Sequence, residues 1–268
     1  MIDGHIHIER GDYTVEWIQQ FVDKAVEMKL DEIWLLEHCY RFTEFLPMYD
    51  SVCSYSDYID KWFHRKAGVL NLNDFLILID RIRGRSYPVK IKFGLEICYF
   101  EDFEKLVRDL TRDIKLDFLL GSVHFIDNFA FDHQAEFWTD IDVNNAYKSY
   151  FERAINLARS GIYSGIAHPD CIKLFGHSPS FPLENYYEKL AKTLSDSNMY
   201  AEESSGINRR CPETATLGMN EKMIKIMKKH DVKIITVSDA HHPNDVGDKI
   251  SIMENKLNNI RFSVFRII

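Results

Sequence analysis

The sequence predicts an α/β fold whose parallel strands form either an open doubly wound sheet or a closed barrel. Seven short apolar segments alternate with longer segments whose apolar residues recur at helical spacing, and strands that alternate with helices pair in parallel. No GxGxxG or GxxxxGK[ST] sequence follows any of the seven segments, which weakens nucleotide-binding versions of the open sheet. The 268 residues suit a single domain, expected over 1–268.

The first predicted strand, "IDGHIHIE", shows how polar and apolar residues alternate. Side chains of a strand point alternately to its two faces. Ile6 and Ile8 therefore face a buried core, while His5, His7 and Glu9 share the opposite face. The predicted strands cover residues 2–9, 31–38, 89–98, 117–125, 161–169, 199–205 and 233–242.

Amphipathic segments separate these strands. In residues 14–29, for example, Trp17 and Phe21 belong to an apolar row at helical spacing, which indicates core packing. Segments 40–72 and 126–143 carry no strand signal, and we expect them to lie over one face of the molecule. The predicted helices cover residues 14–29, 73–85, 103–114, 144–160, 183–197 and 214–230.

Composition excludes several classes of protein. The formal net charge of −8 disfavours a general nucleic-acid-binding surface, although a local cluster of cations would still bind a small phosphate ester. No run of about 18 uncharged apolar residues predicts a membrane span, and no basic region followed by an apolar run predicts a signal peptide. The five cysteines are widely spaced without CxxC. We therefore expect no disulfide framework and a cytoplasmic location.

Metal-competent side chains gather where the predicted strands end. A histidine alone is most simply a surface or core residue, but carboxylates at Glu9, Glu96 and Asp239 accompany the histidines here. The C-terminal ends of parallel strands surround one site, and a shared metal cluster satisfies all these groups at once. Imidazoles and carboxylates without thiolates suit Zn, Fe or Mn. Six of the eleven histidines fall at such ends: His5, His7, His38, His124, His168 and His241.

Six blocks along nearly the whole chain carry a family resemblance. They read "DGHIH", "EH" at 37–38, "GLEI" at 94–97, "GSVHF" at 121–125, "AHPD" at 167–170 and "SDAHHP" at 238–243. The sequence resembles the polymerase and histidinol phosphatase (PHP) superfamily, and within it the histidinol-phosphate phosphatases. The resemblance implies a distorted (β/α)7 barrel of the TIM-like type with three divalent metals at its C-terminal end. It also implies hydrolysis of L-histidinol phosphate to L-histidinol and phosphate in histidine biosynthesis.

The resemblance also implies a ligand set. The first metal is held by His5, His7, Glu96 and Asp239, the second by Glu96, His124 and His168, and the third by His38, His241 and one further ligand. Many relatives supply a later histidine, but this chain has none between residues 8 and 37. We expect Glu9 to replace it, because strand alternation places Glu9 beside His7, whereas Asp12 is more simply a helix N-cap. Alternation points Glu37 away from the metals, as a supporting carboxylate.

The implied chemistry is attack by a metal-bridging hydroxide on the phosphorus, with Glu96, Asp239 and His241 in the catalytic centre. Asp239 or a neighbouring histidine would protonate the leaving oxygen. For the phosphate we expect one of Arg209 and Arg210, which follow the sixth strand. Further candidates for binding the phosphate or another part of the substrate are Arg153, Lys173, His177 and His242. For the amine and imidazole of histidinol, the candidates are Glu202, Glu203, Phe42, Tyr40 and Trp138.

Three other functions compete with this one. The same site would serve a PHP phosphoesterase that acts on nucleotides or other small phosphate esters. An incomplete third site would suit a metal-dependent binding protein without catalysis. A carbon–nitrogen hydrolase of the wider metal-barrel type would need a bridging lysine, and no lysine ends the corresponding strand. Nothing in the sequence indicates an oligomeric state.

Overall fold

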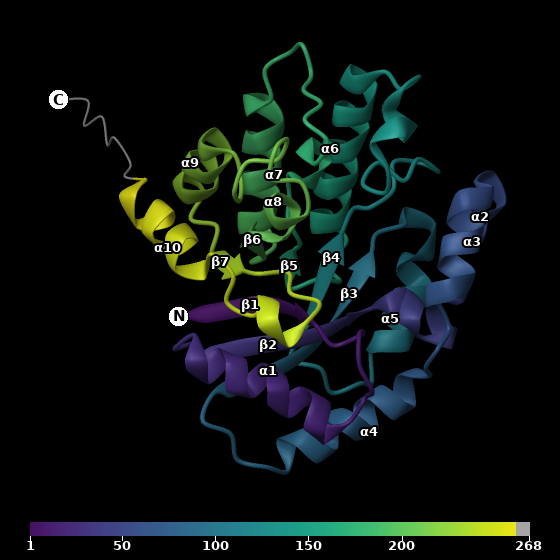
Figure 1. Ribbon diagram of the computed structural model, residues 1–268. Coiled ribbons are helices and arrows are strands. Elements are labelled where there is room, and N and C mark those ends of the chain that lie inside the picture. Colours follow the sequence, from purple (N-terminus) through teal and green to yellow (C-terminus); the bar gives the residue numbers. More distant parts are fainter. Residues whose placement is uncertain (261–268) are drawn as a thin grey trace.

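The computed structural model describes residues 1–260 and shows seven parallel strands in a nearly closed barrel, with helices around them (Figure 1). Each strand pairs with the next in chain order. The barrel is therefore confirmed over the open sheet, while the extent of the domain over 1–268 stays a prediction, since 261–268 lie outside the described residues. The strands are β1 (Ile2–His7), β2 (Glu32–His38), β3 (Lys90–Cys98), β4 (Phe118–Ser122), β5 (Gly165–Ile166), β6 (Tyr200–Ser204) and β7 (Ile234–Val237).

Helices follow the strands and cover the outside of the barrel (Figure 1). The α-helices are α1 (Val15–Glu27), α2 (Asp50–Tyr55), α3 (Asp57–Lys66), α4 (Leu72–Arg83), α5 (Glu104–Thr111), α6 (Val143–Arg159), α7 (Glu184–Asp196), α8 (Gly206–Arg210), α9 (Glu221–Lys229) and α10 (Ile250–Asn259). Short 3₁₀ helices are η1 (Cys39–Arg41), η2 (Thr43–Tyr49), η3 (Glu101–Phe103), η4 (Ala135–Trp138), η5 (Cys171–Lys173) and η6 (Pro243–Asp245). Within residues 1–260, none of these helices has the length and apolar character that crossing a membrane requires.

Two apolar cores hold the barrel. Along β2, Ile33 and Leu35 join the large core between strands and helices, while Trp34 and Leu36 join a small core inside the barrel. The inner core also contains Phe118, and it fills the barrel below His38 at the end of β2. The C-terminal ends of the strands are thereby left to polar side chains.

Several strands are shorter than the sequence predicts, because the residues that follow them turn away. β5 contains two residues instead of the nine over 161–169, and β7 ends at Val237 instead of 242. His168 and Asp239, just beyond these strands, have φ angles of 28° and 53°, in the left-handed region that strands exclude. Left-handed backbone in non-glycine residues clusters at functional sites.

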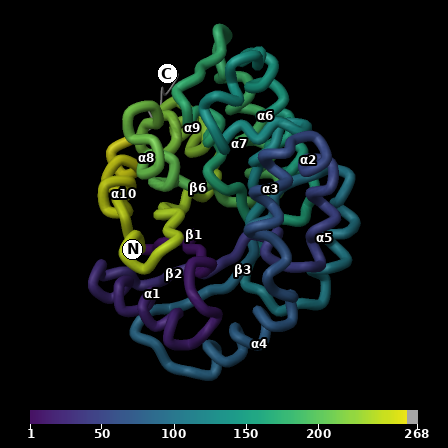
Figure 2. Tube along the Cα trace, turned by 45° about the vertical axis from the view of Figure 1, so that its right-hand side comes forward, coloured from purple at the N-terminus to yellow at the C-terminus, as the bar shows by residue number. Residues whose placement is uncertain are grey.

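The structure also differs from the prediction in where two helices begin and in the conformation of residues 40–72. The last helix predicted at 214–230 begins only at Glu221, since Gly218 has a φ of 66° and the Asn220 side chain caps the helix. Asp12 is not the N-cap of α1; the Thr14 side chain accepts the hydrogen bond from Trp17 N instead. Residues 40–72 contain no strand, as predicted, but they form η1, η2, α2 and α3, and Figure 2 shows α2 and α3 as a pair at the periphery.

The barrel closes between its first and last strands. Pairing there is one parallel bridge, Ile6 with Ala240, with His7 N donating to Ala240 O at 2.7 Å. The β1–β2 register shifts between Asp3 and Ile6, so Gly4 faces into the barrel, where a Cβ would lie 2.8 Å from Ile235. This contact between β1 and the end of β7 is called the seam below.

Asp3 strengthens the seam, and its replacement by alanine is expected to lower the free energy of unfolding. Its two carboxylate oxygens accept hydrogen bonds from Ser238 N and Gly247 N, both at 2.8 Å. Burial raises the pKa of Asp3 to about 6, which means that burial destabilises the charged carboxylate and offsets part of its hydrogen bonding. The expected decrease in the free energy of unfolding is therefore modest, about 2 kcal/mol. Urea denaturation measures it, with exposed Asp113→Ala as control. An equal, small effect of both variants would contradict the role of Asp3.

Candidate metal centre

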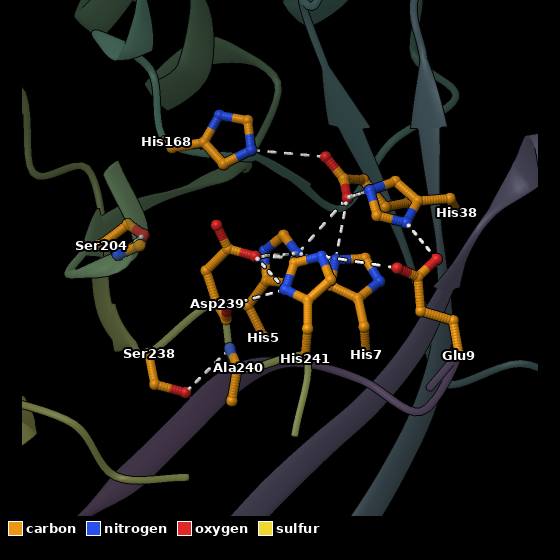
Figure 3. A network of polar contacts seen from close by, with 12 residues as sticks. His5, His7, Glu9, His38, His168, Ser204, Ser238, Asp239, Ala240 and His241 are labelled. Atoms are coloured by element: carbon orange, nitrogen blue, oxygen red, sulfur yellow. Dashed lines mark hydrogen bonds and ion pairs between the residues drawn. The ribbon is translucent and has the colours of Figure 1, made fainter. Parts of the chain in front are cut away.

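All nine predicted ligands converge at the C-terminal end of the barrel, and Figure 3 shows most of them facing one another. Each comes from a strand end or from the first residues beyond it, so the barrel itself sets their positions. His5, His7, Glu96 and His168 are buried, and seven of the nine, all except His5 and His7, line a cavity. The nine are His5, His7 and Glu9 from β1 and its extension, His38 from β2, Glu96 from β3, His124 after β4, His168 after β5, and Asp239 and His241 after β7.

Glu96 lies at the centre of the cluster and faces two groups of histidines. Its Oε1 lies 3.0 Å from His124 Nε2 and 3.4 Å from His168 Nε2. Its Oε2 lies within 3.4 Å of Nε2 atoms on the other side, those of His5, His7 and His38. Burial alone raises the pKa of Glu96, but the surrounding histidines outweigh burial and hold the pKa well below its usual range. Glu96 is thus an ionised carboxylate in the position of a bridging ligand.

His7 shows why this donor set suits metal ions. Its ring stacks on that of His38 with centroids 3.9 Å apart, and the His241 ring is 4.3 Å away. Its Nε2 lies 2.8 Å from His5 Nε2. Burial, with His38 and His241 nearby, holds the pKa of His7 well below its usual value, so this imidazole is neutral, the form that binds metals.

The ligand atoms form overlapping groups that fit divalent ions. In each of four groups they lie within 4.8 Å of one another: His5, His7 and Glu96; Glu96, His124 and His168; His7, His38 and His241; and Glu9, Glu37 and His38. The first two share Glu96, as expected for a bridging ligand. The mixture of nitrogen and carboxylate oxygen fits Zn, Fe or Mn.

The geometry favours Glu9 over Asp12 as the ligand that completes a third site. Glu9 Oε2 lies 3.4 Å from His38 Nδ1 and Oε1 lies 4.0 Å from His241 Nε2. Glu9 lies beyond the end of β1 but keeps its predicted direction. Asp12 is exposed to solvent.

Replacing Glu9 with glutamine is therefore expected to lower the number of metal ions bound per chain by about one. A neutral amide is a poor ligand for a divalent ion, and loss of a ligand weakens binding by orders of magnitude. Elemental analysis of the purified protein measures the stoichiometry. Asp12→Asn is the matched control and should bind as many ions as the unmodified chain; the reverse pattern would assign the third site to Asp12.

Two carboxylates that orient ligands were not predicted in that role. Glu202 lies against His5 Nδ1, with its oxygens 3.0 and 3.1 Å away, and it also accepts from His168 N at 3.1 Å. Asp132 Oδ2 lies 2.9 Å from His124 Nδ1. A carboxylate on the second ring nitrogen fixes the orientation of a metal-binding histidine. The proposed contact of Glu202 with the substrate amine is therefore wrong, because Glu202 is fully buried behind His5.

Glu37 was predicted to point away from the ligands. It is fully buried and accepts a hydrogen bond from Ile8 N at 2.9 Å. Burial and the nearby Glu9 raise its pKa well above its usual range, despite Arg41. Glu37 supports the start of the loop after β1, although one of its oxygens also falls in the group with Glu9 and His38.

A cavity of about 560 Å³ opens above the ligands and includes both predicted arginines in its lining. Arg209 donates to Ser238 O at 2.7 Å and to Asp239 O at 2.6 Å, and it pairs with Asp248 at 3.3 Å. Arg210 donates to His133 O at 3.0 Å. The two neighbours thus differ: Arg209 holds the turn that carries Asp239, while Arg210 extends from the exposed side of α8.

Gly206 at the start of α8 packs directly on Asp239. A Cβ at Gly206 would lie 2.6 Å from the Asp239 Cβ and closer still to its carboxylate. Arg209 contacts the backbone of the same residue from another side. Asp239 is therefore held by α8 as well as by the end of β7.

Three other phosphate candidates do not reach the cavity. Arg153 pairs with Asp127, and the ring of His242 packs edge-on against Trp17 at 6.0 Å. Neither belongs to the residues that line the cavity. Lys173 pairs with Asp170 at 2.8 Å and is likewise outside this lining.

Of the remaining candidates for contact with the substrate, which are His177 and those for the amine and imidazole of histidinol, Tyr40 alone lines the cavity. The others have structural contacts: Phe42 is fully buried, Trp138 donates to Phe131 O at 2.8 Å, His177 stacks on Trp138 at 4.4 Å and Glu203 pairs with Lys256 at 2.7 Å.

Comparison with known proteins agrees with this architecture. The family model for the PHP domain matches residues 3–205, and the chain belongs to this family. Similar to it is the "Probable histidinol-phosphatase" of Deinococcus radiodurans, 24% identical over 253 residues, which cover 92% of this chain and 88% of that protein. The crystal structure of histidinol phosphate phosphatase from Lactococcus lactis subsp. lactis, complexed with zinc, L-histidinol and phosphate, superposes with a TM-score of 0.72. It is 17% identical and the match covers 97% of this chain and 94% of that one.

Proposed function

We propose that this chain is a metal-dependent phosphomonoesterase that hydrolyses L-histidinol phosphate to L-histidinol and phosphate. The observation that carries the proposal is the position of Glu96, which turns one oxygen to each of two histidine groups at the floor of the cavity. The names of the D. radiodurans relative and of the L. lactis protein, with zinc, histidinol and phosphate bound to the latter, support this substrate.

Three divalent ions would be held by the nine ligands, with Glu96 shared by two ions and Glu9 on the third. When bound, such ions lower the pKa of water and neutralise phosphoryl oxygens. Monoester hydrolysis is so slow in water that electrostatic stabilisation must supply much of the rate. The chain contributes the fixed ligand geometry, through the carboxylates of Glu202 and Asp132 that orient His5 and His124.

The two arginines take different roles in this proposal. Arg210 binds the phosphate group, because its guanidinium lies at the cavity and pairs with no carboxylate within residues 1–260. It donates to His133 O and lies over the Phe175 ring, 5.9 Å from its centroid. Arg209 positions Asp239 through the backbone. Burial alone raises the pKa of Asp239, but His5, His241 and His7 bring it down to about 2. Asp239 is therefore ionised at neutral pH, which favours a ligand and not the proton donor to the leaving oxygen.

A substrate panel tests the proposed function. With zinc or manganese supplied, kcat/KM for L-histidinol phosphate should exceed that for p-nitrophenyl phosphate and for AMP by at least about 100-fold, or roughly 3 kcal/mol of discrimination. Equal rates on histidinol phosphate and p-nitrophenyl phosphate would overturn the substrate, and preference for AMP would assign a nucleotide phosphatase. No hydrolysis of any of the three would overturn the phosphomonoesterase itself.

A further inference from the structure

One side of the cavity is a continuous surface of aromatic rings that the metal ligands do not use. We call it the aromatic wall; it consists of Tyr40, Tyr58, Trp62, Phe125 and His133. The first three come from the segment between β2 and α4, and the other two from the segment after β4. All five line the same cavity as Glu96 and Arg210.

The wall extends from the metal centre outward. The Tyr40 ring stacks on that of His38 at 4.8 Å, and Trp62 meets Tyr40 edge-on at 5.2 Å. Trp62 in turn contacts the His133 ring at 4.7 Å, and Tyr58 lies 6.0 Å from His133. A ligand whose phosphate lies over the metal ligands would therefore place the rest of its structure along these rings.

The positions of Tyr58 and Trp62 on α3 argue against a purely structural role. Ile59 and Phe63 form the row of α3 that packs into the core, with 1% and 8% of their surfaces exposed. Tyr58 and Trp62 form the neighbouring row, four residues apart, and remain partly exposed at the cavity. Residues at this spacing share one face of a helix. The anchoring of α3 is thus provided by Ile59 and Phe63, and the other row presents two large rings to the cavity.

We propose that the aromatic wall is the subsite for a flat ring on the leaving alcohol, and that Trp62 and Tyr58 determine which phosphate esters the protein accepts. Aromatic side chains bind planar groups by stacked or edge-to-face contacts. Arg210 donates to His133 O at 3.0 Å, which places the phosphate-binding cation beside the wall. Lys66, one turn beyond Trp62 on α3, also lines the cavity and favours a ring without positive charge, such as neutral imidazole. This inference rests on the proposed phosphomonoesterase function.

Two substrates that differ in the ring test the proposal. L-Histidinol phosphate carries an imidazole, and ethanolamine phosphate keeps an amine and a phosphate ester without a ring. Trp62→Ala should reduce kcat/KM for histidinol phosphate at least about tenfold, mainly through KM, and should change that for ethanolamine phosphate less than about twofold. Trp62→Phe should retain most of the activity on histidinol phosphate. Tyr55→Ala is the control, since Tyr55 is 71% exposed on neighbouring α2 and lies outside the cavity.

Binding of L-histidinol in the presence of phosphate, measured by calorimetry, gives a second readout that needs no turnover. Affinity should fall at least about tenfold in Trp62→Ala and in Tyr58→Ala, at unchanged metal content. Equal losses on both substrates, or unchanged affinity in both variants, would overturn the wall as a ring subsite. If Trp62→Ala does not fold, Tyr58→Ala and Trp62→Phe decide by the same criteria. Absence of phosphatase activity in the unmodified protein would instead overturn the proposed function.

Discussion

Glu96→Gln is expected to reduce kcat by at least about 10³-fold and to lower the number of bound metal ions. Both carboxylate oxygens of Glu96 face histidine nitrogens, with five imidazoles within 3.4 Å. The amide keeps the size of the side chain but removes its charge and one of its two oxygens. Of the two proposed metal sites that share Glu96, one would lose its ligand oxygen and the other would keep only a neutral amide oxygen.

Steady-state kinetics with L-histidinol phosphate and elemental analysis of the same preparation measure the two effects. Glu213→Gln is the matched control, because Glu213 is exposed and does not line the cavity. A Glu96→Gln protein that keeps its metals and more than about a tenth of its activity would show that Glu96 is not the shared ligand.

Removal of metal by a chelator is expected to abolish phosphatase activity and to lower the melting temperature by about 10 °C. Ions present at about 1,000 times their dissociation constant stabilise the folded state by about 4 kcal/mol, and about 1 kcal/mol corresponds to roughly 2–4 °C for a chain of this size. Without ions, the buried imidazoles and carboxylates lose the partners that offset the free-energy cost of burying polar and charged groups.

Differential scanning calorimetry before and after dialysis measures this loss, and addition of Zn²⁺ or Mn²⁺ should restore both stability and activity. Glu96→Gln serves as the internal control, since a chain that binds fewer ions should lose less stability on chelation. If the unmodified protein keeps its melting temperature and its activity after complete removal of metal, the cluster has no metal-dependent role.

The parts of the centre that follow from strand alternation were predictable from the sequence. His5 and His7 face inward while Ile6 and Ile8 enter the outer core, as alternation requires. Glu96 lies near the C-terminal end of β3, and predicting its position required only the direction of that strand. Such predictions succeed because the two-residue alternation of side chains in a strand determines both which residues are buried in the core and which face the ligand site.

Residues that approach the site from loops were not predictable in the same way. Asp132 reaches His124 from a segment without regular structure, and no period relates the two positions. Glu202 was recognised as polar, but its direction depends on the packing of β6 beside His5. The roles of Arg209 and Arg210 depend on a five-residue helix, which is too short to produce a periodic pattern.

The sequence also could not predict which aromatic side chains of residues 40–72 face the cavity. Their abundance was visible, but core packing and cavity lining require the same residue types. Only the structure separates Ile59 and Phe63, which pack inward, from Tyr58 and Trp62, which face the cavity.

The seam has a consequence for the order in which the protein matures during synthesis. His5 and His7 each precede their partners Asp239 and His241 by 234 residues, so they leave the ribosome well before them. A chain that has been synthesised only to the end of β6 therefore carries seven of the nine predicted ligands on a barrel that still lacks its closing strand. Under the proposed ligand set, the complete centre could be loaded only after translation has passed residue 241. The ions would then connect β1 to the residues after β7, which backbone pairing joins by one bridge among the described residues.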